Sequence, residues 1–156
     1  MCIRDRLNPD FRDILSAFNE EKVEYLVVGA YALAAHGFVR ATGDIDLWIR
    51  CSEENAERVV KALIKFGAPL FDLTTDDLKK PDLIFQIGVV PRRIDILTSI
   101  DGVTFEGAWA LRKEITVEDM KVQVISRPHL LRNKRKTGRP KDKADVAWLE
   151  KENPED

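Results

Sequence analysis

The sequence has little of what builds disulfide frameworks, zinc sites or membrane spans. Its two cysteines, Cys2 and Cys51, form neither a disulfide framework nor a zinc pattern. The N-terminus has no apolar stretch that could serve as a signal peptide. The longest apolar run, Tyr25–Ala35, is too short to cross a bilayer. We therefore expect a cytoplasmic protein with reduced thiols and no membrane partner.

An excess of one charge is also missing. The chain has 25 Lys and Arg against 27 Asp and Glu, a net charge of −2, so overall charge favours no class of partner. The distribution is uneven, because residues 126–145 carry a net charge of +6 and the rest of the chain carries −8. A basic segment on an acidic body indicates a local phosphate or nucleic-acid contact, although a solvated helix face has the same composition.

Length and composition suit one soluble globular domain. The 156 residues are 44% apolar and 33% charged, which is ordinary for a chain with a buried core. We expect a single domain over residues 7–151 and a frayed tail over 152–156. Residues 1–6 resemble the in-frame translation of a sequencing adaptor, so we expect them to be non-native.

Apolar periodicity and turn residues predict alternating helices and strands. Helices are predicted from Asn8-Pro9 through Phe18, over 30–36, from Ser52 to Gly67, and over 105–111, 129–136 and 140–151. Strands are predicted over 23–28, 44–49, 83–87, 93–97, 114–117 and 121–125, with a surface excursion over 71–81. The helix after Ser52 has an apolar face of Ala56, Val59, Val60, Leu63 and Ile64. This order predicts an α/β or α+β fold, with a mixed sheet flanked by helices and a C-terminal helical segment.

Three aspartates stand in strand patterns that bring them to one face. Residues i and i+2 of a strand face the same side, about 6.6–7 Å apart. Asp44 and Asp46 therefore share a face, while Ile45 points into the core. Asp95 stands between apolar residues on a second predicted strand. If the two strands are neighbours, the three carboxylates converge.

Such convergence is unfavourable without a cation. Two carboxylates about 5 Å apart repel by about 3 kcal/mol at an effective dielectric constant of about 20. Mg²⁺ prefers oxygen ligands and combines carboxylates with substrate phosphates, and two ions can clamp the attacking and leaving oxygens of an in-line displacement. The pattern predicts a site for a divalent metal, Mg²⁺ with Mn²⁺ as a substitute, on Asp44, Asp46 and Asp95. For the Asp-apolar-Asp motif alone, a solvated sheet face is the alternative.

Gly29 lies where a buried strand is predicted to turn into a helix. Glycine lets a backbone approach a ligand closely, and a helix N-terminus favours phosphate. Gly29 and Ala30 are therefore candidates for contacting phosphates, although many strand–helix turns use glycine for geometry only.

These pieces together resemble the nucleotidyltransferase fold of the DNA polymerase β superfamily. They are Gly29-Ala30, Asp44-Ile45-Asp46-Leu47 and Ile94-Asp95-Ile96. The stretch from Val28 to Asp46, and Gly138-Arg139-Pro140-Lys141-Asp142 with Asp145, are similar to small bacterial nucleotidyltransferases grouped with AbiEii-type toxins. The resemblance covers about residues 11–149. Ala30 departs from it, because the family usually has Gly or Ser there and Ala offers no hydroxyl to a triphosphate.

The resemblance implies transfer of a nucleoside monophosphate from a nucleoside triphosphate to an acceptor hydroxyl. Asp44 and Asp46 would hold Mg²⁺ on the triphosphate, and Asp95 would hold the second ion and help deprotonate the acceptor. Attack on the α-phosphorus would release pyrophosphate, with catalysis coming mainly from positioning and charge neutralisation. The expected acceptor is an RNA 3′-end or a protein side chain, with a small molecule such as an aminoglycoside left open. The expected setting is a toxin–antitoxin or phage-defence system with a cognate partner protein.

Further polar residues are candidates for contacting the phosphates or an RNA backbone. They are Arg40, Thr42, Lys134, Arg139 and Lys141. Arginine suits bidentate contact with phosphate and lysine suits point-charge contact. Thr42 could instead form a turn or cap, and the three C-terminal cations could instead lie on a solvated basic helix.

Three rival interpretations use the same motifs. Haloacid-dehalogenase-like phosphatases and many glycosyltransferases place Asp-x-Asp at the carboxyl end of an apolar strand, whereas Asp44 begins its strand, which disfavours both. A non-catalytic nucleotidyltransferase-like module, such as an antitoxin or regulatory subunit, is the alternative. Ala30 favours that alternative and the intact trio of aspartates disfavours it.

Overall fold

A computed structural model describes residues 8–38, 43–88 and 92–151, which form a mixed sheet with helices on both sides. The strands are β1 (Tyr25–Val28), β2 (Asp44–Ile49), β3 (Ile84–Ile87), β4 (Arg93–Leu97), β5 (Lys113–Val117) and β6 (Met120–Val124). The helices are α1 (Pro9–Glu20), α2 (Gly29–Ala35), α3 (Glu53–Phe66), α4 (Phe105–Ala110), α5 (Arg127–Thr137) and α6 (Lys143–Lys151). Two 3₁₀ turns are η1 (Asp77–Lys79) and η2 (Pro140–Asp142). The predicted fold class is confirmed, while the predicted segments at 1–6 and 152–156 lie outside the described residues.

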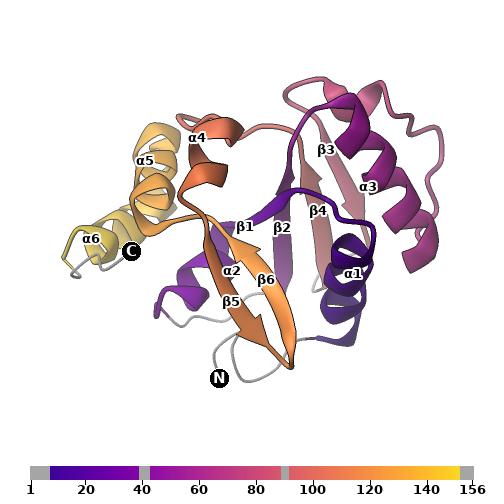
Figure 1. Cartoon of the computed structure of the whole chain (residues 1–156). Helices are drawn as coiled ribbons and strands as arrows, with labels where there is room; N and C mark the ends of the chain where they lie inside the picture. The colour runs from indigo at the N-terminus through magenta and orange to yellow at the C-terminus, as the bar shows by residue number, and fades with distance from the viewer. Residues whose placement is uncertain (1–7, 39–42, 89–91, 152–156) are drawn as a thin grey trace.

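The sheet has six strands in the order β3-β4-β2-β1-β6-β5. Strand β2 runs parallel to β4, and β1 runs parallel to β6. The other three pairs are antiparallel, and two of them are the hairpins β3–β4 and β5–β6. In this order, the strand with the Asp-apolar-Asp motif lies beside the strand with the third aspartate (Figure 1).

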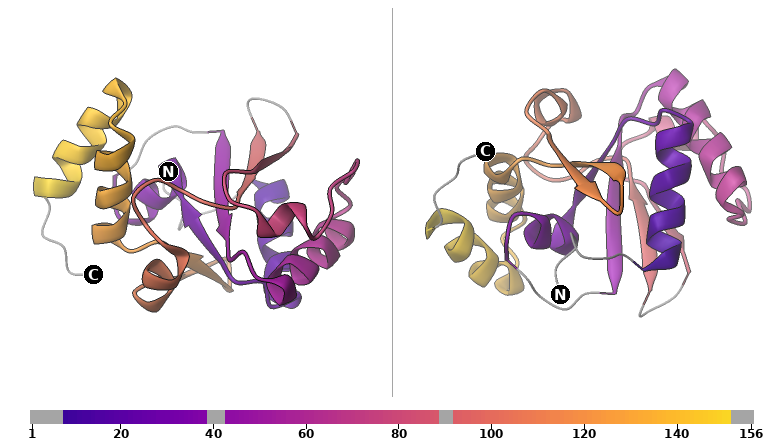
Figure 2. Two further views of the ribbon diagram at one scale, coloured as in Figure 1. Left: turned by 90° about the horizontal axis from the view of Figure 1, so that it is seen from above. Right: turned by 60° about the horizontal axis from the view of Figure 1, so that its bottom comes forward.

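Helices cover the two faces of the sheet unequally. Helices α1 and α3 pack against each other on one side, and α2, α5 and α6 lie on the other side (Figures 1 and 2). Ile45 and Leu47 of β2 are fully buried and alternate with Asp44 and Asp46, which face the side of α2. None of the helices in the described ranges has both the length and the apolar character of a membrane span.

Local signals set most of the element ends. The side chains of Asn8, Ser52 and Ser126 cap the N-termini of α1, α3 and α5 by accepting backbone N–H hydrogen bonds. Gly67 and Gly138 end α3 and α5 in the left-handed conformation. The β5–β6 turn places Glu118 and Asp119 at positive φ, as a two-residue hairpin loop with matching twist requires.

Three local predictions differ from the structure. Ile64 was expected on the apolar face of α3 but is 61% exposed, because the buried stripe runs through Ala56, Val59, Ala62 and Leu63. Val23 is buried but lies before β1, after Lys22 at positive φ. The predicted helix 140–151 opens with the 3₁₀ turn η2 before α6 begins.

Candidate active site

Strand register brings the three predicted aspartates together. Asp46 on β2 pairs directly with Asp95 on the parallel neighbour β4, and Asp44 lies two residues before Asp46. All three side chains line one cavity of about 360 Å³. The convergence that the sequence predicts is therefore present, while the catalytic and metal-binding roles of the three residues stay predictions.

The surroundings of Asp46 raise the pKa of its carboxyl group. Burial, followed by the negative charges of Asp95 and Asp44, raises its pKa to about 6. The positive charges of Arg93 and Lys134 act in the opposite direction without cancelling that rise. The carboxylate of Asp46 is therefore more stable in this cavity with a proton or a cation bound to it than alone.

Gly29 makes room for Asp46. It has φ +72°, and a Cβ built on it would lie 2.3 Å from the Asp46 Oδ2 atom. Any other residue would therefore collide with the carboxylate and strain the backbone. Gly29 and Ala30 both line the cavity, and their contact with phosphates stays a prediction. The close approach of Asp46 gives a structural reason for glycine at this turn.

Arg93 lies among the carboxylates, and sequence reasoning missed it. Its Nε and Nη2 atoms donate to the two oxygens of Asp95 at 3.0 and 3.2 Å. Its Nη2 also lies 3.4 Å from the Asp44 Oδ2 atom. The signal was available, because Arg93 stands two residues before Asp95 on the same strand and so shares its face.

A buried ion cluster lies where α5, η2 and α6 meet. Lys134 is 7% exposed, and its Nζ atom lies 3.2 Å from Asp142 Oδ1 and 3.3 Å from Asp145 Oδ2. Arg139 Nε donates to Asp142 Oδ2 at 2.9 Å. Burial alone would raise the pKa of Asp142, but the bond from Arg139 and the charge of Lys134 hold it below its usual value. The alternative of a solvated helix face is therefore wrong for Lys134.

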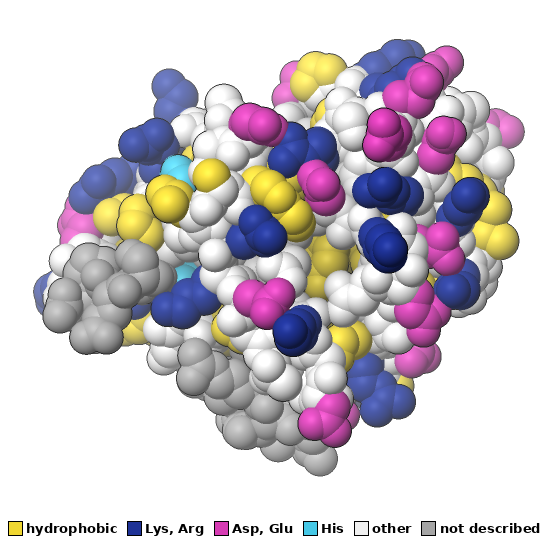
Figure 3. All heavy atoms as spheres, in the orientation of Figure 1, with side chains coloured by type: hydrophobic (Ala, Val, Ile, Leu, Met, Phe, Trp, Pro, Cys, Tyr) yellow, Lys and Arg dark blue, Asp and Glu magenta, His cyan; other side chains and the backbone are white. Residues whose placement is uncertain are grey.

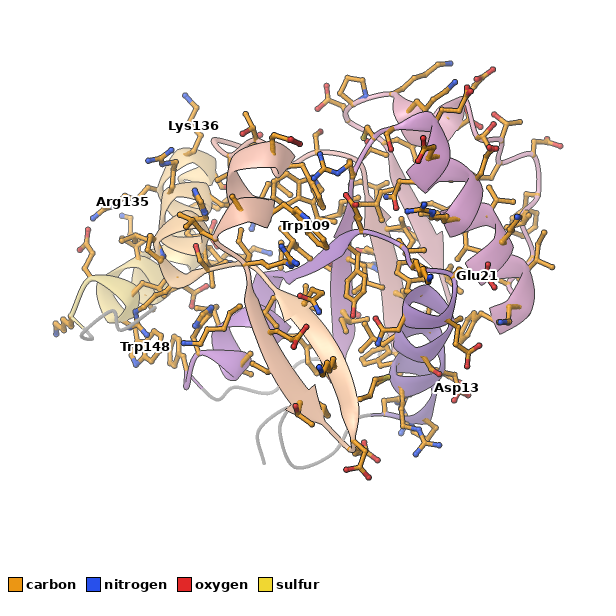
Figure 4. The ribbon with its side chains drawn as sticks, viewed as in Figure 1. Asp13, Glu21, Trp109, Arg135, Lys136 and Trp148 are labelled. Atoms are coloured by element: carbon orange, nitrogen blue, oxygen red, sulfur yellow. The ribbon has the colours of Figure 1, made fainter. Side chains whose placement is uncertain are left out.

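The C-terminal cations divide between this cavity and the outer surface. Lys134, Arg139 and Lys141 line the same cavity as the three aspartates, as do Asp142 and Asp145. Arg135 pairs with Glu150 of α6, and Lys136 extends away from the body of the protein on α5 (Figure 4). Lys and Arg side chains dominate the surface over α5 in Figure 3. The candidates Arg40 and Thr42 lie outside the described residues.

The donor chemistry of the trio fits Mg²⁺. Asp44, Asp46 and Asp95 offer only carboxylate oxygens, on two strands held in register by the sheet. In the ranges that the structure describes, no three His, Cys, Asp or Glu side chains are arranged as a group that could hold a metal ion. Arg93 bonds to two of the three aspartates in the present arrangement.

Comparison with solved structures identifies the fold. The protein TM1012 of Thermotoga maritima, described as a nucleotidyltransferase, matches 95% of this chain and 98% of its own, with a TM-score of 0.60 and 17% identity. The lincosamide adenylyltransferase LnuA, solved with lincomycin, matches 94% of this chain and 98% of its own, with a TM-score of 0.58 and 18% identity. The antibiotic-resistance factor ANT(2'')-Ia matches 90% of this chain and 80% of its own, with a TM-score of 0.59 and 14% identity. No family model matches the sequence, and neither does any curated protein. The chain thus has the nucleotidyltransferase fold.

Proposed function

We propose that this protein is a metal-dependent nucleotidyltransferase that moves a nucleoside monophosphate from a nucleoside triphosphate to an acceptor hydroxyl. The observation that carries the proposal is the in-register placement of Asp44, Asp46 and Asp95 in one cavity. Cations from the C-terminal segment line the same cavity, which suits a highly charged phosphate substrate. The shared fold with nucleotidyltransferases such as LnuA supports this class of reaction.

The carboxylates and the cations have separate roles in this proposal. Asp44 and Asp46 would hold Mg²⁺ on the triphosphate, and Asp95 would hold a second ion and help remove the proton of the acceptor hydroxyl. When bound, the metal neutralises the phosphate charge and polarises the α-phosphorus. The acceptor oxygen forms a bond to that phosphorus while the bond to the bridging oxygen breaks, and pyrophosphate leaves.

Lys141 is the cation best suited to hold the leaving pyrophosphate. It is exposed, lines the cavity, and stands two residues after Arg139 on the segment before α6. Lys134 is engaged by two buried carboxylates, so its charge acts on the cavity from a fixed position. Gly29 and Ala30 place backbone at the same cavity, where the phosphates are expected. The charge of Lys134 and the backbone at Gly29 and Ala30, both fixed in position, would orient a triphosphate before reaction.

The acceptor is proposed to be an RNA 3′-end or a protein side chain. The basic surface of α5, which includes Arg135 and Lys136, supports an acidic or nucleic-acid partner. The likeness of the Gly138–Asp142 motif to AbiEii-type proteins suggests a cytoplasmic toxin–antitoxin or phage-defence setting. LnuA is named for a lincosamide acceptor, so small antibiotics belong in the same acceptor screen.

Calorimetric titration with ATP, GTP, CTP and UTP in Mg²⁺ tests the proposed site. We expect binding of at least one nucleotide that EDTA abolishes and that the double variant Asp44→Asn/Asp46→Asn lacks. Lys141→Gln is expected to weaken that binding without removing its metal dependence, because it deletes one phosphate contact and no carboxylate.

A protein without metal-dependent nucleotide binding would instead fit the non-catalytic antitoxin or regulatory module. In that case the double variant and the wild type would give the same heats of titration. The two functions are thereby separated by binding alone, before any acceptor is known.

A further inference from the structure

Arg93 lies among the three carboxylates of the cavity. It stands on β4 opposite Asp44 and two residues before Asp95, so strand geometry directs all three side chains to one face. Its guanidinium contacts both oxygens of Asp95 and one oxygen of Asp44. Arg93 therefore places a positive charge beside two of the three carboxylates, those of Asp44 and Asp95.

This contact restricts how Asp95 can serve a metal. A bidentate guanidinium pair uses one lone pair on each carboxylate oxygen and fixes the plane of the carboxylate. A divalent cation on the same oxygens would lie within a few ångströms of the guanidinium and be repelled by it. The Asp95 side chain is 10% exposed, which leaves it little freedom to turn away from Arg93.

Arginine also differs from a metal in that its charge is covalently part of the chain. Its guanidinium stays protonated at every physiological pH, and strand β4 holds its backbone in place. Asp46, by contrast, lines the same cavity but is not one of the two carboxylates that Arg93 pairs with. Of the three carboxylates, Asp46 is thus the one left for a cation, with Asp44 beside it on the same strand and in contact with Arg93 through one oxygen.

We propose that Arg93 replaces one of the two metal ions expected for this fold, so that the centre takes a single divalent cation on Asp44 and Asp46. Arg93 is then a positioning residue that neutralises Asp95 and fixes its orientation toward the acceptor hydroxyl. The inference rests on the proposed nucleotidyl transfer and alters its metal stoichiometry from two ions to one.

The test is the number of Mn²⁺ ions bound per chain, measured by electron paramagnetic resonance with α,β-methylene-ATP present. We expect one Mn²⁺ for the wild type and two for Arg93→Gln, because removal of the guanidinium opens the Asp95 oxygens. Arg93→Lys keeps a positive charge and is expected to bind one. Arg58→Gln, on α3 and outside the cavity lining, is the matched control and is expected to bind one.

Other outcomes overturn the proposal in distinguishable ways. Two Mn²⁺ ions in the wild type would show that Arg93 does not replace a metal, while leaving nucleotidyl transfer intact. One ion in a folded Arg93→Gln variant, checked by circular dichroism, would show that the guanidinium does not exclude the second ion. Absence of Mn²⁺ from the wild type would reject this inference together with the proposed function.

Discussion

At Asp46, burial and two neighbouring carboxylates act in the same direction on the pKa. The pKa of about 6 in the folded protein lies above the ordinary value of 3.8. The folded state therefore binds this proton more tightly than the unfolded state does. The resulting loss of stability is absent below the ordinary pKa. It grows as the pH rises from the ordinary pKa to about 6 and levels off at about 3 kcal/mol above that.

Asp46→Asn removes this cost. We expect the metal-free variant to be more stable than the wild type to urea at about pH 7.5, by up to about 3 kcal/mol, and equally stable at about pH 4. Urea unfolding followed by circular dichroism at both pH values measures the difference. A gain of equal size at both pH values would show that the titration of Asp46 is not its cause.

At Gly29, both backbone conformation and space exclude a side chain. Gly29→Ala is expected to cost more than the roughly 1 kcal/mol of a positive-φ substitution, because the added Cβ also meets the Asp46 carboxylate. Gly67→Ala is the matched control, with φ +92° and no atom within 4 Å of the place that its added Cβ would take. Equal losses in the two variants by urea unfolding would contradict the steric role of Gly29.

At the scale of elements, the segment α5–η2–α6 is held by buried charge. Lys134→Ala would leave Asp142 and Asp145 without their shared cation, and we expect it to lower the free energy of unfolding by about 3–5 kcal/mol. Lys143→Ala, at an exposed position at the start of α6, is expected to change it by less than about 0.5 kcal/mol. Similar small losses from both would mean that the cluster contributes little to holding this segment.

Sequence patterns located most elements but not all side-chain partners. The bounds of β2 and β4 follow from alternation of charged and apolar residues, and the N-cap of α3 follows from Ser52. The sequence patterns do not determine that β2 pairs with β4, because the two strands are far apart in the chain. Ile64 was misplaced because an apolar residue one position beyond the buried stripe looks the same in sequence.

At the scale of the whole molecule, the site depends on segments that are far apart in the chain. The β1–α2 turn, β2, β4 and the C-terminal segment each contribute residues to one cavity. The three aspartates could be predicted because their spacing on strands is local information. The burial of Lys134 could not, because a basic residue is expected to be solvated until its partners are placed. The bond from Arg93 to Asp95 was missed although the two residues share a face of β4.

Transfer of label from nucleoside triphosphates labelled at the α-phosphate tests the central claim most directly. The purified protein is incubated with each labelled nucleotide, Mg²⁺, total RNA and lysate protein, and the acceptor fractions are separated and counted. We predict that the wild type labels one fraction, and that Asp95→Ala and Asp95→Asn, both folded by circular dichroism, label none. Equal labelling by the wild type and both variants would contradict the role of the three aspartates in nucleotidyl transfer.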